Sequence, residues 1–341
     1  MTTRREVIVG AAAVGLASVG LPAWARGGTG DTRPLAALLL PLTGTGADLA
    51  RSLHHAASLA QPLAAAGGAK PPPLPVFDCG SGPDGGAAAA RAAIATGAPL
   101  LIGPVYGPQV AGALAAAGGV PVLTLSNDAD VARGSFVLGI TAGQAVGAIL
   151  GYARARGVRR VMVAAGPSRW DVAAAAAATI VARDLGLVLT ADAPDAVLVP
   201  GDADALTAAA RARERDGPQL LGTYQGLALT GAGLEAIDGA WLAAPDPAAF
   251  AEFARRFETA FGNPPGALAG LAYDAASIAR SLRASGHGDP ASVRDALTGS
   301  AGFPGVAGAV RFRADGSATR ELAILVADGG SFRAVARSQP A

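Results

Sequence analysis

Short apolar runs alternate with longer alanine-rich segments along most of the 341-residue chain. The stretches LAALLL at 35–40, PLLI at 99–102 and RVMV at 160–163 are runs of this kind. Such runs fit strands of a parallel sheet that is covered on both faces, and the segments between them have helical spacing. Because parallel neighbours need a crossover, usually a helix, the alternation predicts an α/β fold of repeated βα units, with mostly parallel sheets flanked by helices.

The same pattern places the individual elements. Strands are predicted at 35–40, 74–77, 99–102, 120–125, 135–139, 160–164, 188–190, 196–199, 219–222 and 239–242. Helices are predicted at 47–65, 85–96, 109–117, 144–156, 171–185, 204–216, 247–261 and 268–285. Residues 307–335 predict three short strands, with turns at Ala314-Asp315-Gly316 and Asp328-Gly329-Gly330. No linker rich in Pro, Gly and Ser divides the middle, which favours two α/β lobes between which the chain crosses several times.

Residues 1–25 have the pattern of an export signal. Arg4 and Arg5 precede an apolar run from Val7 to Leu21, and Ala23-Trp24-Ala25 follows as a cleavage site. Paired arginines before a mild, Gly- and Ala-rich run resemble a twin-arginine signal peptide. A membrane span needs about 20 residues, so this run is short for one, although a retained anchor stays the alternative. We expect cleavage near Ala25, a mature chain in the periplasm, and no membrane insertion after cleavage.

The charge balance and the cysteine content exclude several classes of partner. With 27 Lys and Arg against 26 Asp and Glu, the net charge is +1. A near-neutral chain predicts neither nucleic acid nor an anionic membrane surface as partner. The one cysteine, Cys79, can form no internal disulfide, so we expect it to pack behind a strand end.

No motif predicts catalysis, a metal or a cofactor. His54 and His55 are adjacent on a predicted helix, so their side chains point about 100° apart and cannot share a metal as an i, i+4 pair can. Gly44-Thr45-Gly46 lacks the third glycine of a dinucleotide fingerprint and is better explained as a tight turn before a helix. P-loop and nucleophile-elbow motifs are absent from the sequence. No combination of residues in the sequence therefore calls for an enzyme, although the absence of these motifs alone leaves an enzyme as an open alternative.

Three widely spaced segments, 37–60, 100–132 and 303–335, resemble the type I periplasmic solute-binding proteins of the leucine/isoleucine/valine-binding family. The segment 257–282 is similar to the part of that family that leads into the late helix of the first lobe. The resemblance implies a two-lobed fold with three crossings, near 139–141, 242–245 and 310–313. Lobe 1 would be 32–140 plus 246–309, and lobe 2 would be 141–245 plus 310–337, with the ligand in the cleft between them.

A branch of that family is the alternative. The Ser-Asn-Asp ending of the strand VPVLTLSND and the closing pattern G-x-x-x-F-R-x-D-G-x-x-x-R resemble penicillin-binding protein activators. That resemblance implies a regulator whose partner is a peptidoglycan synthase. The resemblance to the leucine/isoleucine/valine-binding family instead implies a protein that binds a small ligand and delivers it to the permease of an ABC transporter.

The resemblance also implies the ligand-binding residues. In the first lobe these are Ser126, Asn127 and Asp128 at a strand end, and Tyr106 in the loop after Gly103-Pro104. A ligand-free turn is the alternative for the triplet, because Ser, Asn and Asp end strands by bonding to nearby backbone. In the second lobe, Trp170 takes the place of a tyrosine that covers the ligand in relatives, and Tyr224 takes the place of an acid that binds an ammonium group. The resemblance as a whole implies a small polar, amino-acid-like ligand.

Overall fold

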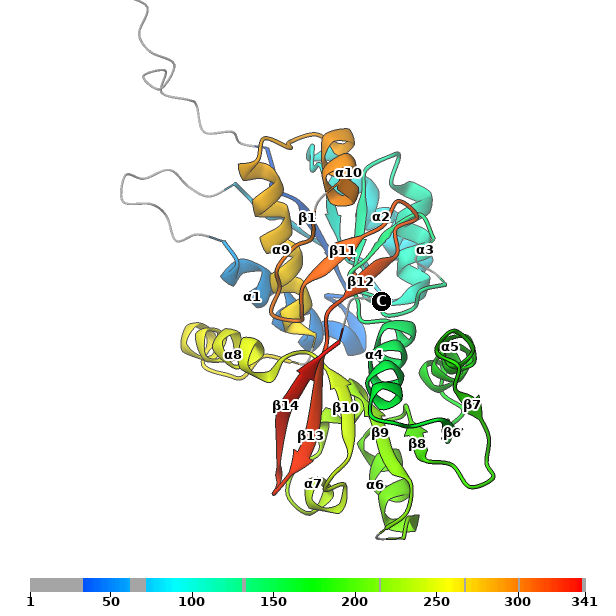
Figure 1. The fold of residues 1–341 in the computed structure, drawn as a ribbon. Coiled ribbons are helices and arrows are strands. Elements are labelled where there is room, and N and C mark those ends of the chain that lie inside the picture. Colours follow the sequence, from blue (N-terminus) through cyan, green and yellow to red (C-terminus); the bar gives the residue numbers. More distant parts are fainter. Residues whose placement is uncertain are drawn as a thin grey trace, which may run out of the picture. The chain divides into compact units, whose positions relative to one another are not determined.

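The computed structural model describes residues 33–61, 72–130, 133–214, 216–266, 268–299 and 301–338. Residues 33–341 form one compact unit, and only this unit is considered below. The predicted signal, 1–25, lies outside the described residues. The unit has the predicted α/β architecture, with two main sheets that are each covered by helices and each belong to one lobe (Figure 1).

The sheet of lobe 1 is five-stranded and entirely parallel. Its strands, in spatial order, are β2 (Val76–Asp78), β1 (Ala37–Leu40), β3 (Leu101–Ile102), β4 (Val122–Thr124) and β5 (Phe136–Val137). Helices α1 (Ala47–Leu59), α8 (Pro247–Phe261), α9 (Ala269–Ala284) and α10 (Pro290–Gly299) cover one face, and α2 (Pro83–Ala95) and α3 (Gly107–Ala116) the other. In β1, Leu38 and Leu40 point to the face covered by α1, α8, α9 and α10, and Leu39 points to the face covered by α2 and α3. This alternation is the two-residue repeat of a strand.

The sheet of lobe 2 is seven-stranded and mixed. Its spatial order is β14 (Ser331–Arg337), β13 (Ala323–Asp328), β10 (Trp241–Ala244), β9 (Gln219–Thr223), β8 (Ala196–Val199), β6 (Arg160–Val163) and β7 (Val188–Leu189). The strands from β10 to β7 are parallel, whereas β13 and β14 form an antiparallel hairpin. Helices α4 (Ala142–Ala155) and α5 (Arg169–Leu185) cover one face, and α6 (Ala203–Ala212) and α7 (Ala232–Ala236) the other.

The chain passes between the lobes three times. Leu138 belongs to the core of lobe 1 and Ile140 to that of lobe 2, so the first crossing is at Gly139. The second lies between Ala244, at the end of β10, and the start of α8. The third lies between Arg320, at the end of β12 (Ala318–Arg320), and Leu322 in the core of lobe 2.

The third crossing corrects the sequence analysis, which placed it at 310–313 and assigned 310–337 to lobe 2. Strand β11 (Val310–Phe312) pairs with β12 as a separate hairpin, and Val310, Phe312 and Ala318 lie in the core of lobe 1. The ring of Phe312 meets that of Phe136 in β5 edge-on, at 5.6 Å between centroids. These apolar side chains bury best against lobe 1, so 310–320 belongs to that lobe.

Other sequence expectations can be compared directly with the structure. The turns at 314–316 and 328–330 are present, but they separate four strands rather than three. Helices α7 and α10 were not predicted from the sequence. Cys79 is fully buried among the side chains of α2, α3 and the lobe 1 sheet, and burial raises the pKa of its thiol to about 12. Within the described ranges, no helix combines the length and apolar character needed to cross a membrane.

Candidate ligand site between the lobes

The Ser-Asn-Asp triplet forms a turn at the end of β4. The Ser126 amide donates to Thr124 Oγ1 at 3.1 Å, and the Asp128 amide donates to Ser126 Oγ at 3.2 Å. Asp128 Oδ1 in turn accepts from the Asp130 amide at 3.0 Å. Ser126 is only 4% exposed, so its hydroxyl serves the turn. This local bonding leaves the Asn127 amide and the second Asp128 oxygen free to point elsewhere.

Asn127 reaches across to lobe 2 and meets Tyr224. Its Nδ2 donates to the Tyr224 hydroxyl at 3.3 Å, and that hydroxyl donates to the Ile140 carbonyl at 3.0 Å. Tyr224 begins a short 3-10 helix directly after β9, where the Thr223 hydroxyl accepts the Gln225 amide. Burial raises the pKa of the Tyr224 phenol, so it stays protonated at neutral pH and can act as donor.

Trp170 stands beside Tyr224 at the start of α5. The two rings meet edge-on, with centroids 5.2 Å apart. The Trp170 indole N–H donates to the Pro200 carbonyl at 2.7 Å, and the Thr223 hydroxyl donates to the same oxygen at 2.9 Å. Trp170 is therefore held against the strand ends of β8 and β9 and is half-buried. This position places it next to the inter-lobe contact of Tyr224.

A second contact joins the lobes at Asp128. Its Oδ2 lies 3.2 Å from Arg169 Nη2, with Arg169 located at the first position of α5. The Arg169 side chain is 86% exposed and that of Asp128 28%, so solvent weakens the attraction. The pair nevertheless places a positive charge beside the Asp128 carboxylate.

Tyr106 stands apart from the other five predicted residues. It precedes α3 as its N-cap residue and is 43% exposed. Among the described residues, no hydrogen bond or ring contact joins it to Ser126, Asn127, Asp128, Trp170 or Tyr224. The structure thus joins three of the six side chains, Asn127, Trp170 and Tyr224, in one set of contacts across the lobes. Asp128 contacts Arg169 of the other lobe, Ser126 stays in the turn, and Tyr106 shares no contact with the other five among the described residues.

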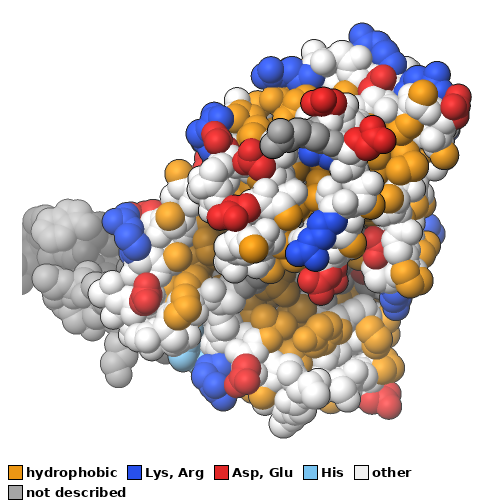
Figure 2. Space-filling model, turned by 90° about the horizontal axis from the view of Figure 1, so that it is seen from below, with side chains coloured by type: hydrophobic (Ala, Val, Ile, Leu, Met, Phe, Trp, Pro, Cys, Tyr) orange, Lys and Arg blue, Asp and Glu red, His pale blue; other side chains and the backbone are white. Residues whose placement is uncertain are grey.

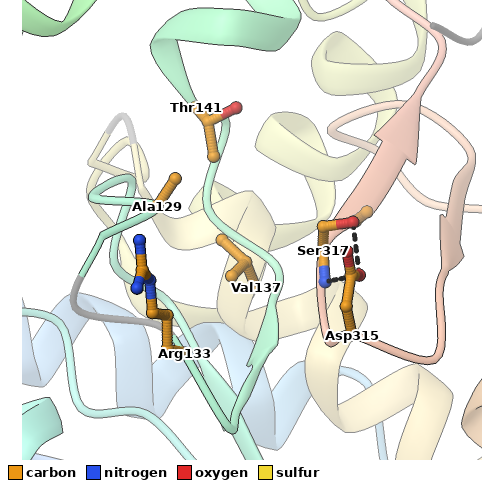
Figure 3. A pocket seen from close by; sticks show the side chains of 7 residues that line it. Ala129, Arg133, Val137, Thr141, Asp315 and Ser317 are labelled. Carbon is orange, nitrogen blue, oxygen red and sulfur yellow. Dashed lines mark hydrogen bonds between the residues drawn. The ribbon is translucent and has the colours of Figure 1, made fainter.

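A cavity of about 390 Å³ lies near the first crossing and is lined by none of the six residues. Its walls come from the loop between β4 and β5, from Thr141 at the start of α4, and from the β11–β12 hairpin (Figure 3). Seen from below, the surface also shows a hollow with a largely hydrophobic floor and charged side chains on the raised parts around it (Figure 2). No group of His, Cys, Asp and Glu in the described ranges is arranged to hold a metal ion.

Comparison with known proteins identifies the family. A sequence profile of the family described as "Periplasmic binding protein" matches residues 36–226 and 189–331, which together span most of the chain. The chain belongs to the periplasmic binding proteins. This confirms the family predicted from sequence, and it makes the chain a solute-binding protein rather than an enzyme. No curated protein sequence matches the chain.

Solved structures share the fold over nearly their whole length. A putative branched-chain amino acid ABC transporter protein from Rhodospirillum rubrum is 22% identical, with a TM-score of 0.75 over 88% of this chain and 99% of that one. The leucine-binding protein LivK of Thermotoga maritima is 19% identical, with a TM-score of 0.62 over 89% and 98%. A solute-binding protein of Rhodopseudomonas palustris, solved with 3,4-dihydroxybenzoic acid, is 18% identical, with a TM-score of 0.67 over 89% and 97%. At these identities the likeness is one of fold.

Two residues of this periplasmic binding protein that join the lobes were missed by the sequence analysis. Arg169 pairs with Asp128, and the Gln144 side chain donates to the Ala318 carbonyl at 2.6 Å, from α4 to β12. Arg169 could have been suspected, since it directly precedes Trp170 at a helix start. The spacing of Thr141 and Gln144 indicates a capping box at the start of α4. Nothing in the sequence indicates the second hydrogen bond of Gln144, which goes to Ala318.

Proposed function

We propose that this periplasmic binding protein is the solute-binding component of an ABC transporter and holds a small amino-acid-like ligand between its lobes. The observation that carries the proposal is the meeting of Asn127 from lobe 1 with Tyr224 from lobe 2, with Trp170 against the same ring. A ligand favours the closed form only if it contacts both lobes, and these side chains come from both. Export through the signal at 1–25 and action in the periplasm are part of the proposal.

The chemistry of these side chains supports an amphipathic ligand. The Asn127 amide and the exposed Arg169 guanidinium can hydrogen-bond a carboxylate, while the ring of Trp170 offers an apolar wall. Two related folds support the same class, since one is a leucine-binding protein and another was solved with 3,4-dihydroxybenzoic acid. An amino acid with an apolar side chain and an aromatic acid share this combination of one carboxylate and an apolar body.

Calorimetry on the mature chain tests the proposal with L-leucine, benzoate and 3,4-dihydroxybenzoate as probes. We expect saturable binding of at least one probe, and a loss of about 5-fold to 150-fold in affinity for Trp170→Ala, which corresponds to about 1 to 3 kcal/mol of apolar contact. Trp241→Ala is the matched control, because Trp241 is a half-buried tryptophan of the same lobe that packs on Tyr152. Absence of heat with all probes, or equal losses in both variants, would count against the proposal.

A regulator of a peptidoglycan synthase is the second candidate, and one observation favours it. The lobes already bind each other through Asn127–Tyr224 and Asp128–Arg169, so the protein's own side chains occupy part of the gap between them. Affinity capture from a cell-envelope extract separates the two functions. Enrichment of a peptidoglycan synthase, with no small-molecule binding, would support the regulator, whereas enrichment of a permease would support the transporter role.

A further inference from the structure

The cavity at the first crossing is separate from the proposed ligand site. Its volume is about 390 Å³, and its lining includes Arg133 from the loop before β5, Val137 of β5, and Asp315 from the turn of the β11–β12 hairpin. Thr141, the N-cap residue of α4, lines the cavity from lobe 2. A molecule in this cavity would therefore contact both lobes beside the segment on which they hinge.

The walls of this cavity are held in place by contacts of their own. The Val137 amide donates to the Gly316 carbonyl at 3.0 Å, which fixes the hairpin turn against β5. Gly316 has a φ of +83°, and a Cβ there would lie 1.9 Å from the Ser135 carbonyl oxygen, so the turn requires glycine. On the other side, the Gln144 side chain ties α4 to Ala318 of β12. The cavity is thus formed before any molecule enters it.

Opposite charges stand on opposite sides of the cavity. Figure 3 shows Arg133 on one side of Val137 and Asp315 on the other. Asp315 Oδ1 accepts from the Ser317 amide at 2.9 Å and from the Ser317 hydroxyl at 2.7 Å, which leaves its second oxygen for another donor. These two bonds, helped by the nearby Arg313, lower the pKa of Asp315, so the carboxylate is ionised at neutral pH.

Arg133 is available to a ligand. Its side chain is exposed, and no ion pair joins it to a carboxylate among the described residues. A guanidinium is suited to grip a carboxylate with two parallel hydrogen bonds. The surface between Arg133 and Asp315 is apolar, being formed by Ala129, Val137 and Ala318. A ligand that complements Arg133, Asp315 and the apolar lining carries a carboxylate at one end, an ammonium group at the other, and a short apolar part between them.

We propose that this cavity is a second binding site, for a short linear zwitterion such as a dipeptide of small residues. Its carboxylate lies on Arg133 and its ammonium on Asp315. Because the occupant also contacts Thr141 of lobe 2, binding stabilises one arrangement of the lobes and so couples to the ligand site between them. This inference does not depend on the ligand proposed above, since none of the six predicted residues lines the cavity.

Calorimetry with L-alanyl-L-alanine on the mature chain tests the inference. N-acetyl-L-alanyl-L-alanine, which lacks the ammonium, and L-alanyl-L-alanine amide, which lacks the carboxylate, are the matched probes. We expect the free dipeptide to bind about 10-fold to 100-fold more tightly than either blocked form, as for the loss of one charge-assisted hydrogen bond. Arg133→Gln should remove the preference for a free carboxylate. Asp315→Asn should remove the preference for a free ammonium, while its amide oxygen still accepts the Ser317 bonds.

Three results would overturn the inference without bearing on the proposed function, and a fourth would move the dipeptide to the other site. These are no heat with the free dipeptide, equal binding of all three probes, and unchanged preferences in both variants. Loss of dipeptide binding in Trp170→Ala, with Arg133→Gln unaffected, would place the dipeptide between the lobes instead, which contradicts this inference and leaves the proposed function standing. Thermal unfolding of the two variants checks that each is folded. Their midpoints are expected within a few degrees of that of the parent, because both residues are exposed.

Discussion

Tyr224 connects the lobes through a single hydroxyl. It accepts from Asn127 of lobe 1 and donates to Ile140, which directly follows the first crossing. The ring itself packs in the cores of lobe 2. Removal of the hydroxyl alone therefore separates the inter-lobe bond from the packing of the ring.

Tyr224→Phe is expected to lower the free energy of unfolding by about 1 to 3 kcal/mol, because the buried Ile140 carbonyl loses its donor. Urea denaturation measures the change. Tyr152→Phe is the control, since the structure shows ring contacts of Tyr152 but no hydrogen bond from its hydroxyl within the described residues. Equal changes in the two variants would contradict this role of the Tyr224 hydroxyl.

Asp274 predicts a pH dependence of stability. Its carboxylate accepts from the Val306 and Ala307 amides at 2.8 and 3.0 Å, yet burial raises its pKa from 3.8 to about 6. Between about pH 4 and pH 6 the native state keeps a proton that the unfolded chain has released. The contribution of Asp274 to the free energy of unfolding therefore falls as pH rises through this window, by up to about 3 kcal/mol, and is constant above it.

Chemical denaturation of the parent and of Asp274→Asn at about pH 4.5 and pH 7 measures this contribution. The variant loses a backbone hydrogen bond at both pH values, so only the change in the difference is informative. The free energy of unfolding of the parent, relative to that of the variant, should be larger at pH 4.5 than at pH 7. A difference that is the same at both pH values would show that Asp274 titrates alike in the folded and unfolded chains.

At the residue scale, the sequence could name residues of the candidate site but not their hydrogen bonds. Trp170 and Tyr224 were predicted by family resemblance and do lie together with Asn127 and Asp128. Their hydrogen bonds to Pro200 and Ile140 join positions that are distant in the sequence and are set by how the strand ends meet. No pattern in a single sequence records such pairs.

At the element scale, helices α2 and α3 of lobe 1 pack closely against each other at two glycines. A Cβ on Gly112 of α3 would lie 1.8 Å from the Pro83 carbonyl oxygen of α2, and one on Gly86 of α2 would lie 2.2 Å from the Gln109 carbonyl oxygen. Each helix thus places a glycine where the backbone of the other passes. The close packing of α2 on α3 depends on both positions.

Gly112→Ala is expected to destabilise the protein by about 1 to 3 kcal/mol, as overpacking usually does, although alanine favours a helix. Gly151→Ala in α4 is the matched control, because no atom lies within 4 Å of a Cβ placed there. It should be neutral or stabilise by up to about 1 kcal/mol. Thermal unfolding of both variants measures the difference, and stabilisation by Gly112→Ala would refute the close approach.

Most elements of the fold were predictable because their patterns are local. Apolar runs and helical spacing located the strands and long helices to within a few residues, as α8 at Pro247–Phe261 illustrates. The β11–β12 hairpin was assigned to the other lobe because the family resemblance implied a third crossing at 310–313, whereas the tertiary contact of Phe312 with Phe136 places the hairpin on lobe 1. The glycine contacts between α2 and α3 likewise depend on packing, which the sequence pattern does not carry.

At the scale of the whole molecule, polar side chains tie the crossings together. The buried Arg320, just before the third crossing, donates to the Leu138 carbonyl beside the first at 2.5 Å. Arg337 of β14 pairs with Asp246 near the second crossing at 2.9 Å and with Glu321 at the third at 2.8 Å. These contacts tie the three crossings to one another.

Lobe movement on ligand binding is the central claim, and a distance measurement tests it most directly. Spin labels at Arg91→Cys in α2 and Arg211→Cys in α6 report one position in each lobe, while the native Cys79 is buried. With the ligand identified by calorimetry, the account predicts that the distances measured by double electron–electron resonance shift to one narrow, shorter population. Trp170→Ala should need more ligand for the same shift. Full binding heat with an unchanged distance distribution would contradict the account.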